Sequence, residues 1–190
     1  MDKKALRSEL KARRGAFAAA QPAFLPAAAP FALPAQFAAW LETARCIAGY
    51  IPIQNEADPL PLLACAAAQG HATALPHITT RTAPMRFLYW KPGTALATGP
   101  MGLSQPAEGT AETAPDIIIT PLVGFDRRLH RIGYGAGFYD RAFAEFPHAK
   151  RIGLAWSVQE VDAVPNDPWD MQLDAVWTER EWIYNGDGKA

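Results

Sequence analysis

The segment at residues 116–123 constrains the fold more than any other part of the chain. It reads Asp-Ile-Ile-Ile-Thr-Pro-Leu-Val, a continuous run rich in β-branched and apolar residues. Such a run is typical of a strand buried on both faces, and such strands lie inside sheets that helices cover on either side. The segment therefore predicts an α/β fold with a largely parallel sheet.

Helices and strands are predicted to alternate along the rest of the chain, which indicates strands joined by crossover helices. Apolar runs bounded by Gly and Pro favour strands, and apolar residues at helical spacing favour helices. The predicted strands span residues 45–52, 71–76, 85–90, 116–123, 151–156 and 176–178, and the predicted helices span 2–20, 35–44, 59–69 and 138–146. The predicted loops span 21–35, 93–114 and 124–137, and residues 185–190 are expected to be frayed.

Length, charge and cysteine content narrow the class of protein. The 190 residues suit a single domain, 1–190, with a full hydrophobic core. The net charge of −1 argues against binding nucleic acid through bulk charge. The N-terminus lacks a signal peptide's apolar region and no stretch approaches the ~20 apolar residues that span a bilayer, so a cytoplasmic protein is expected. Cys46 and Cys65 are expected to be buried thiols rather than zinc ligands.

The predicted first helix carries a strongly basic face. Asp2 is a candidate cap, and Leu6, Leu10 and Phe17 form an apolar stripe. For most of the basic residues a solvated helix face is expected, and one or two could instead reach an anion elsewhere in the fold. The basic residues are Lys3, Lys4, Arg7, Lys11 and Arg14.

A glycine-rich segment follows the central strand. Residues 133–141 read Gly-Tyr-Gly-Ala-Gly-Phe-Tyr-Asp-Arg and are expected to turn into a helix. Glycines let backbone N–H groups approach a phosphate, and a helix N-terminus adds partial positive charge. Arg127, Arg128 and Arg131 could bind phosphate oxygens, and Asp140 could hold Mg²⁺. The competing interpretation is a tight packing turn, but three alternate glycines flanked by arginines and an aspartate favour a phosphate site.

The segment does not match the common nucleotide-binding motifs. No Gly-Lys-Ser/Thr follows the glycines, so it is not a Walker A loop, and its spacing differs from that of the dinucleotide fingerprint. Instead, residues 120–141 resemble the signature of the 5-formyltetrahydrofolate cyclo-ligase family, also called methenyltetrahydrofolate synthetases. Four more segments resemble that family in the same order: residues 3–7, 50–56, 85–90 and 152–174.

The resemblance implies a fold and a reaction. The fold would be a three-layer α/β/α arrangement with a largely parallel central sheet, Rossmann-like (NagB/RpiA/CoA-transferase-like). The reaction would be the ATP-dependent cyclisation of 5-formyltetrahydrofolate to 5,10-methenyltetrahydrofolate, with release of ADP and phosphate. The γ-phosphate would pass to the formyl oxygen, which makes that oxygen a leaving group, and N10 would then attack the activated carbon. The protein would mainly position the reactants and stabilise charge.

The resemblance also implies roles for individual residues. The catalytic residues would be Arg131, Tyr139 and Asp140, and Mg²⁺ would be held by Asp140 and Asp174. ATP would be bound by Lys3 (or Lys4), Arg7, Arg131, Ile132, Gly133, Tyr134, Gly135, Ala136, Gly137, Phe138, Tyr139 and Asp140. The folate would be bound by Ile51, Glu56, Met85, Trp90, Gly135, Ala136, Gly137, Phe138 and Tyr139.

Several of these roles have a structural alternative. A carboxylate at Glu56 suits the donor-rich edge of a pterin, but Glu56 could also be a solvated loop residue. Trp90 and Tyr139 suit the walls of a site for a flat ring, whereas Trp90 and Met85 could belong to the core. Asp174 could be a turn or cap residue.

Two positions near the glycines carry separate expectations. Asp126 is expected to bond backbone N–H groups of its own loop rather than take part in catalysis, and His130 is expected to be exposed. Many family members have glycine or lysine where this chain has Ala136. If that position requires a positive φ, alanine would change the shape of the loop.

Two functions of other classes compete with the enzyme. One is a non-catalytic relative that binds folate or nucleotide, against which Glu56, Arg131, Asp140 and Asp174 argue. The other is an RNA-associated relative, against which the net charge and the length argue. The expected partners are therefore small molecules, 5-formyltetrahydrofolate and ATP with Mg²⁺, without nucleic acid or membrane, bound by a monomer.

Overall fold

A computed structural model describes residues 2–21 and 32–185. The predicted loop at 21–35 lies mostly outside these residues, as does the frayed tail expected at 185–190. The helices are α1 (Lys3–Ala18), α2 (Ala35–Thr43), α3 (Leu60–Ala68) and α4 (Phe138–Glu145), with 3-10 turns η1 (Pro100–Gly102) and η2 (Ser157–Gln159). The strands are β1 (Cys46–Ala48), β2 (Ala72–His77), β3 (Arg86–Tyr89), β4 (Ala97–Thr98), β5 (Ser104–Gln105), β6 (Ile117–Pro121), β7 (Gly124–Phe125), β8 (Arg131–Ile132), β9 (Lys150–Leu154), β10 (Ala175–Trp177) and β11 (Trp182–Tyr184).

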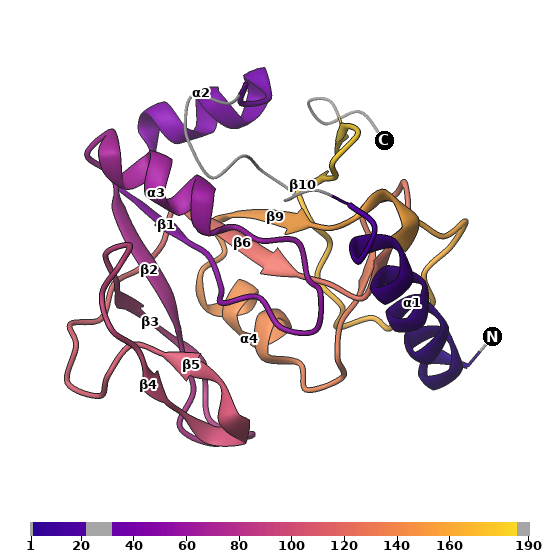
Figure 1. Ribbon diagram of the computed structural model, residues 1–190, viewed down its shortest axis with the longest axis horizontal. Helices are drawn as coiled ribbons and strands as arrows, with labels where there is room; N and C mark the ends of the chain where they lie inside the picture. The colour runs from indigo at the N-terminus through magenta and orange to yellow at the C-terminus, as the bar shows by residue number, and fades with distance from the viewer. Residues whose placement is uncertain (1, 22–31, 186–190) are drawn as a thin grey trace.

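A seven-stranded sheet forms the centre of the molecule (Figure 1). Its order is β11-β10-β9-β6-β1-β2-β3, with β6 in the middle. The inner strands pair in parallel, whereas β3 and β11 are antiparallel to their neighbours at the two edges. The largely parallel sheet predicted from the sequence is therefore confirmed.

The central strand β6 feeds both faces of the sheet, because successive side chains of a strand point in opposite directions. Ile117 and Ile119 pack in a cluster with residues of α2 and α3, and Ile118 packs in a second cluster with residues of α4. All three side chains are buried. Helices thus cover both faces, which confirms the three-layer α/β/α architecture.

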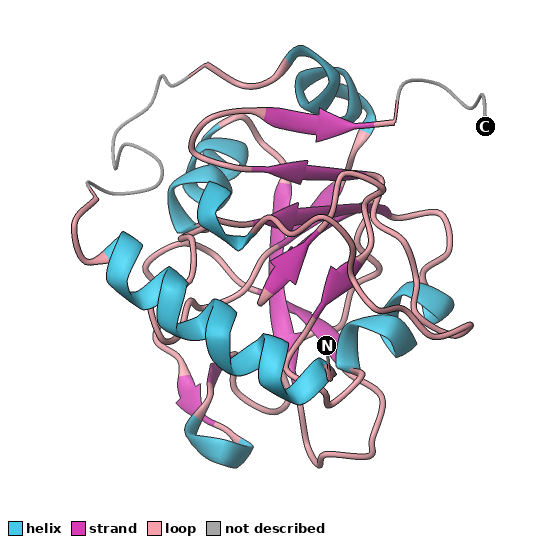
Figure 2. Cartoon of the chain, turned by 90° about the vertical axis from the view of Figure 1, so that its right-hand side faces the viewer, coloured by secondary structure: helices cyan, strands magenta, loops and turns pink. Residues whose placement is uncertain are grey.

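Helix α1 lies beside the sheet rather than on either main layer (Figures 1 and 2). Leu6 and Leu10 are buried against Val123, Ile132 and Val164. Val123 follows β6, Ile132 ends β8, and Val164 follows η2. The predicted apolar stripe is therefore correct at these two positions. Asp2 occupies the cap position, but its side chain makes no capping hydrogen bond, so that part of the prediction is wrong.

Several short elements were not predicted. The loop expected at 93–114 contains β4, η1 and β5, the loop expected at 124–137 contains the β7–β8 pair, and β11 was missed. Each of these strands has two or three residues, too few to display a periodic pattern. Cys46 is buried as expected, Cys65 is only half-buried, and both are thiols. Within the described residues no helix is long and apolar enough to cross a membrane.

Candidate active site

A cavity of about 940 Å³ opens at the carboxyl ends of β1, β2 and β6. Tyr50 follows β1, Ile78 follows β2, and Pro121 ends β6; all three line it. Ligands bind at this edge in open α/β sheets because the loops that follow parallel strands converge there. The remaining walls come from the first turns of α1, the glycine-rich segment, the β4–β5 region and the segment at 167–170.

The glycine-rich segment joins β8 to α4 and lines the cavity. Gly135 and Gly137 have φ values of +94° and +66°, in the left-handed region that glycine tolerates best. Ala136, between them, is not among the described residues with positive φ. Alanine therefore fits this position, and the altered loop shape that a positive φ would have caused does not arise.

Basic residues from three elements, α1, β8 and α4, reach this segment. Arg7 on α1 donates from Nε to the carbonyl oxygen of Gly133 at 2.8 Å. Arg131 pairs with Asp140 in the first turn of α4, with 2.6 Å between Nη2 and Oδ1. Arg141 donates to the carbonyl oxygen of Ala136 at 3.1 Å. The structure thus gathers cationic side chains and glycine backbone on one wall of the cavity.

The aspartates of the cavity include the predicted Asp140 and two that were not predicted. Asp140, Asp167 and Asp170 line it, and Lys3 pairs with the latter two at 2.6 and 2.9 Å. Burial alone would raise the pKa of Asp170, but hydrogen bonds from the Asp167 backbone and from Lys3 outweigh it and lower that pKa. Asp170 is therefore ionised at neutral pH.

Asp174 does not lie with Asp140, so their predicted pairing as metal ligands is corrected. Asp174 precedes β10 at the amino end of the parallel strands, where it accepts hydrogen bonds from the backbone N–H and the side chain of Arg151 at 2.8 and 3.0 Å. It is absent from the cavity lining. Its contacts are those of the cap residue considered as the alternative.

Glu56 lines the cavity within a buried network that includes Tyr134 of the glycine-rich segment. One carboxylate oxygen accepts a hydrogen bond from the hydroxyl of Tyr134, and the other accepts one from the backbone N–H of Ile53 at 2.9 Å. Burial raises the pKa of Glu56, although these hydrogen bonds and nearby Arg14 and Lys11 oppose the rise. Glu56 is thus a buried acceptor facing the cavity, not a solvated loop residue.

Tyrosine hydroxyls surround this carboxylate. Burial, followed by the charge of Glu56, raises the pKa of Tyr50, Tyr134 and Tyr139. All three therefore remain neutral at physiological pH and line the cavity as hydrogen-bonding aromatic groups. Tyr139 stands at the start of α4, between the glycine-rich segment and Glu56's side of the cavity.

Of the predicted apolar walls, Ile51 and Met85 line the cavity and Trp90 does not. Trp90 is buried in the core cluster that includes Leu75 and Leu63, and its indole N–H donates to the carbonyl oxygen of Thr94 at 3.0 Å. The prediction that Trp90 binds the substrate is therefore corrected in favour of its core alternative. Phe138, from the glycine-rich segment, does line the cavity.

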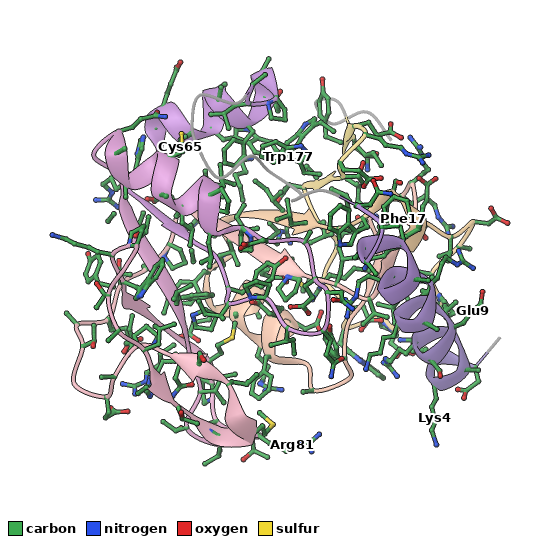
Figure 3. The ribbon with its side chains drawn as sticks, viewed as in Figure 1. Lys4, Glu9, Phe17, Cys65, Arg81 and Trp177 are labelled. Atoms are coloured by element: carbon green, nitrogen blue, oxygen red, sulfur yellow. The ribbon has the colours of Figure 1, made fainter. Side chains whose placement is uncertain are left out.

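Other predicted basic residues lie elsewhere. Lys4 is exposed and extends from the end of α1 away from the molecule (Figure 3). Arg127 pairs with Glu160 and Glu181 on the surface, and Arg128 pairs with Asp126. These three residues are absent from the cavity lining, which corrects Lys4 as an ATP ligand.

The loop predictions for Asp126 and His130 have opposite outcomes. Asp126 is fully buried and accepts hydrogen bonds from the backbone N–H groups of Arg128, His130 and Val164, which confirms the capping role. His130 is half-buried rather than exposed, because its ring packs against Asp126.

Several cavity residues were not predicted, among them Tyr50, Arg81, Trp169 and Asp170. Arg81 lies in the connection between β2 and β3, near the end of the β4–β5 hairpin (Figure 3). Asp170 and Asp174 both belong to the segment 152–174 that resembles the family. The two aspartates together indicated a site, but the sequence did not indicate which of them faces the cavity.

Comparison with known proteins identifies similar chains. The model of the 5-formyltetrahydrofolate cyclo-ligase family matches residues 1–179. The 5-formyltetrahydrofolate cyclo-ligase of Escherichia coli K12 is 32% identical over 142 residues, covering 71% of this chain and 78% of that protein. The enzyme of Haemophilus influenzae is 31% identical over 137 residues, covering 68% and 73%.

A solved structure supports the same fold. The NMR structure of Aquifex aeolicus 5,10-methenyltetrahydrofolate synthetase superposes with a TM-score of 0.70 at 24% identity, covering 100% of this chain and 96% of that one. A synthetase structure from Mycoplasma pneumoniae gives 0.62 at 23% identity, covering 93% and 98%.

Proposed function

Because the chain belongs to the 5-formyltetrahydrofolate cyclo-ligase family, we propose that its cavity binds ATP and 5-formyltetrahydrofolate side by side. The enzyme converts 5-formyltetrahydrofolate to 5,10-methenyltetrahydrofolate at the expense of ATP. The observation that carries the proposed arrangement is one continuous cavity lined by cationic side chains, by the glycine-rich segment and by a buried carboxylate, Glu56.

The cationic wall is the proposed nucleotide side. Lys3, Arg7 and Arg131 line it together with the backbone of residues 133–137. Backbone N–H groups at the start of a helix and arginine side chains both favour phosphate oxygens. In the structure these cations pair with protein acceptors, and phosphate oxygens would take the place of those acceptors.

The carboxylates of this wall fit Mg²⁺. Asp140 and Asp170 both line the cavity, and Mg²⁺ is commonly held by one or two carboxylates together with substrate phosphates. We therefore propose Asp140 and Asp170 as its ligands. When bound, the ion would neutralise charge on the phosphate oxygens. Groups of three or more acidic, histidine or cysteine ligands do not occur in the described part of the chain, which agrees with a site completed by the nucleotide.

The part of the cavity around Glu56 is the proposed folate side. The carboxylate of Glu56 would accept hydrogen bonds from the N–H groups of the pterin, and Ile51, Met85 and Tyr139 would pack on its ring. The formyl oxygen would then attack the γ-phosphorus, displacing ADP and forming a phosphorylated imidate. Attack by N10 on the formyl carbon would close the ring, the C–O bond would break as phosphate leaves, and the N10 proton would pass to the departing phosphate.

The protein's contribution to these steps is positioning and charge stabilisation. Arg131, which is also held by the carbonyl oxygen of Met171, is fixed beside Asp140 and would stabilise the negative charge of the transferring phosphoryl group. Tyr139 is neutral, buried and near both Glu56 and Arg131. Its ring would exclude water from the space between the two substrates.

The test is a turnover assay of the purified protein with 5-formyltetrahydrofolate, ATP and Mg²⁺. We expect ATP-dependent growth of methenyl-folate absorbance with one ADP formed per product, and its loss in Asp140→Asn. Binding of both ligands without turnover would overturn the enzyme in favour of a binding relative. We also propose that the protein acts in the cytoplasm as a single-domain monomer, which light scattering would test for oligomeric state.

A further inference from the structure

Arg14 is a buried charge that the proposed reaction does not use. It lies on α1, follows Leu10 by one helical turn, and is 1% exposed. It does not line the cavity but lies behind the wall that carries Glu56 and Tyr134. A buried guanidinium is costly unless its surroundings use it, so its contacts indicate its role.

The Arg14 guanidinium contacts three segments of the chain. Nη2 donates to the hydroxyl oxygen of Tyr134 at 2.9 Å and to the carbonyl oxygen of Gln54 at 3.0 Å. Nη1 donates to the carbonyl oxygen of Leu122, after β6, at 3.4 Å and lies 4.0 Å from a carboxylate oxygen of Glu56. Helix α1 is thereby tied to the glycine-rich segment and to the loop that presents Glu56.

These contacts fix the direction of a hydrogen-bond chain. Arginine can only donate, so the oxygen of Tyr134 must act as an acceptor toward Arg14. The single hydroxyl proton of Tyr134 is then left for Glu56, to which it donates. The hydrogen bonds from Arg14 to Tyr134 and from Tyr134 to Glu56 hold the carboxylate in one orientation and stabilise its ionised form.

Arg14 also supports an unusual turn next to Glu56. Gln54 and Asn55 have φ values of +49° and +64°, a left-handed conformation that residues other than glycine adopt infrequently. The carbonyl oxygen of Gln54 accepts the bond from Arg14, and that of Asn55 accepts one from the indole of Trp156 at 3.0 Å. Two long-range donors thus hold the turn that sets where Glu56 stands.

We propose that Arg14 is a positioning residue for the folate: through Tyr134 and the 54–55 turn, it holds Glu56 in the arrangement that accepts the pterin. This inference rests on the proposed function only in assigning the pterin to Glu56. Because Arg14 acts through Glu56, its loss should weaken folate binding and leave ATP binding nearly unchanged. A merely structural Arg14 would instead lower stability and affect both ligands alike.

The experiment measures equilibrium binding of 5-formyltetrahydrofolate by calorimetry without ATP, the KM for ATP, and the thermal midpoint. The variants are Arg14→Met, which keeps the apolar stem, Arg14→Lys, which keeps the charge, and the matched control Arg13→Met. Arg13 is exposed and pairs with Glu9 on the surface. We expect Arg14→Met to weaken folate binding about tenfold, Arg14→Lys to weaken it less, and Arg13→Met to change nothing.

A double-mutant cycle isolates the route of the effect. In a Glu56→Gln background, Arg14→Met should weaken folate binding by less than about twofold, because its target is already lost. Full additivity, or equal losses for folate and ATP, would overturn the proposal. If Arg14→Met does not fold, Tyr134→Phe and Arg14→Lys each replace it and are each combined with Glu56→Gln in the same way. Absence of folate binding by the unaltered protein would instead refute the proposed function.

Discussion

The ammonium group of Lys3 lies 2.9 Å from a carboxylate oxygen of Asp170, although the two residues are 167 positions apart. The same carboxylate oxygen accepts the backbone N–H of Asp167 at 2.8 Å. Together with the Arg131–Asp140 pair, this contact leaves the cationic wall of the cavity internally neutralised. Binding of a magnesium–nucleotide complex would exchange partners: the cations would turn to phosphate oxygens and the carboxylates to the metal ion.

Replacing Lys3 should weaken ATP binding, whereas replacing its neighbour Lys4 should not. Lys3→Met removes a charge that lines the cavity, and we expect the KM for ATP to rise about tenfold, the scale of one charged hydrogen bond. Lys4→Met is the matched control, because Lys4 points into solvent (Figure 3). Steady-state kinetics with varied ATP checks both. Equal effects of the two substitutions would contradict the assignment.

Asp170 and Asp174 provide a sharper pair, because only the first lines the cavity. Asp170→Asn should lower kcat/KM for ATP roughly 100-fold, with partial recovery at higher Mg²⁺, since it removes a proposed metal ligand. Asp174→Asn should leave kinetics unchanged and lower the thermal midpoint by about 2–4 °C through its weakened contact with Arg151. Magnesium titration of activity, followed by thermal melting, separates the two outcomes. The site assignment fails if Asp174→Asn is the variant that becomes magnesium-dependent.

Folate binding should depend on pH through Glu56. The pKa of Glu56 is raised by burial, so its proton is taken up at a higher pH than for an ordinary glutamate. An ionised carboxylate is the better acceptor for pterin N–H groups, so affinity should be constant at neutral pH and fall as the pH drops through the raised pKa. The neighbouring Tyr50, Tyr134 and Tyr139 stay neutral over this range, and the basic side chains near Glu56 are those of Arg14 and Lys11.

Calorimetric titrations of 5-formyltetrahydrofolate across this pH range check the prediction. Glu56→Gln is the control, since it removes the titrating group: its binding should be weaker and nearly independent of pH. A wild-type affinity that falls with pH in the same way as that of Glu56→Gln would assign the titration to another group.

The glycine-rich segment should tolerate change at Ala136 but not at Gly135. Gly135 has a φ of +94°, and a Cβ added there would stand 3.5 Å from the Arg7 guanidinium, so Gly135→Ala should cost about 1–2 kcal/mol in backbone strain. We expect a raised KM for ATP in that variant. Ala136→Gly should leave the kinetics within about twofold, because the position needs no positive φ. A large gain of activity in Ala136→Gly would show that alanine distorts the loop.

The elements predicted correctly are those whose signal is local. The β-branched run around Ile118 identifies a strand buried on both faces wherever it stands, and it forms the centre of the sheet. Residues 133–140 similarly combine glycines with a helix start in one short segment, and all of them line the cavity. Their geometry depends on neighbours in sequence, which the chain displays directly.

The errors concern contacts between distant segments. Whether Asp170 or Asp174 faces the cavity depends on where Lys3 and Arg151 lie, and the local pattern of an irregular segment does not reveal that. Trp90 illustrates the same difficulty, since an aromatic residue at a strand end suits a ligand wall and a core equally well. Arg14 did carry a signal: it continues the i, i+4 spacing of Leu6 and Leu10, which places it on the buried face of α1.

The contact of Lys3 with Asp170 has a consequence for the order in which the enzyme becomes complete during synthesis. Strands β1, β2 and β3 leave the ribosome early, whereas Glu56 and its turn acquire their partners Tyr134 and Trp156 only later in the chain. The first helix emerges earliest of all, yet its partners at 167 and 170 emerge near the end of translation. The contacts of Lys3 therefore become possible only after every residue that holds Glu56 and its turn has been synthesised.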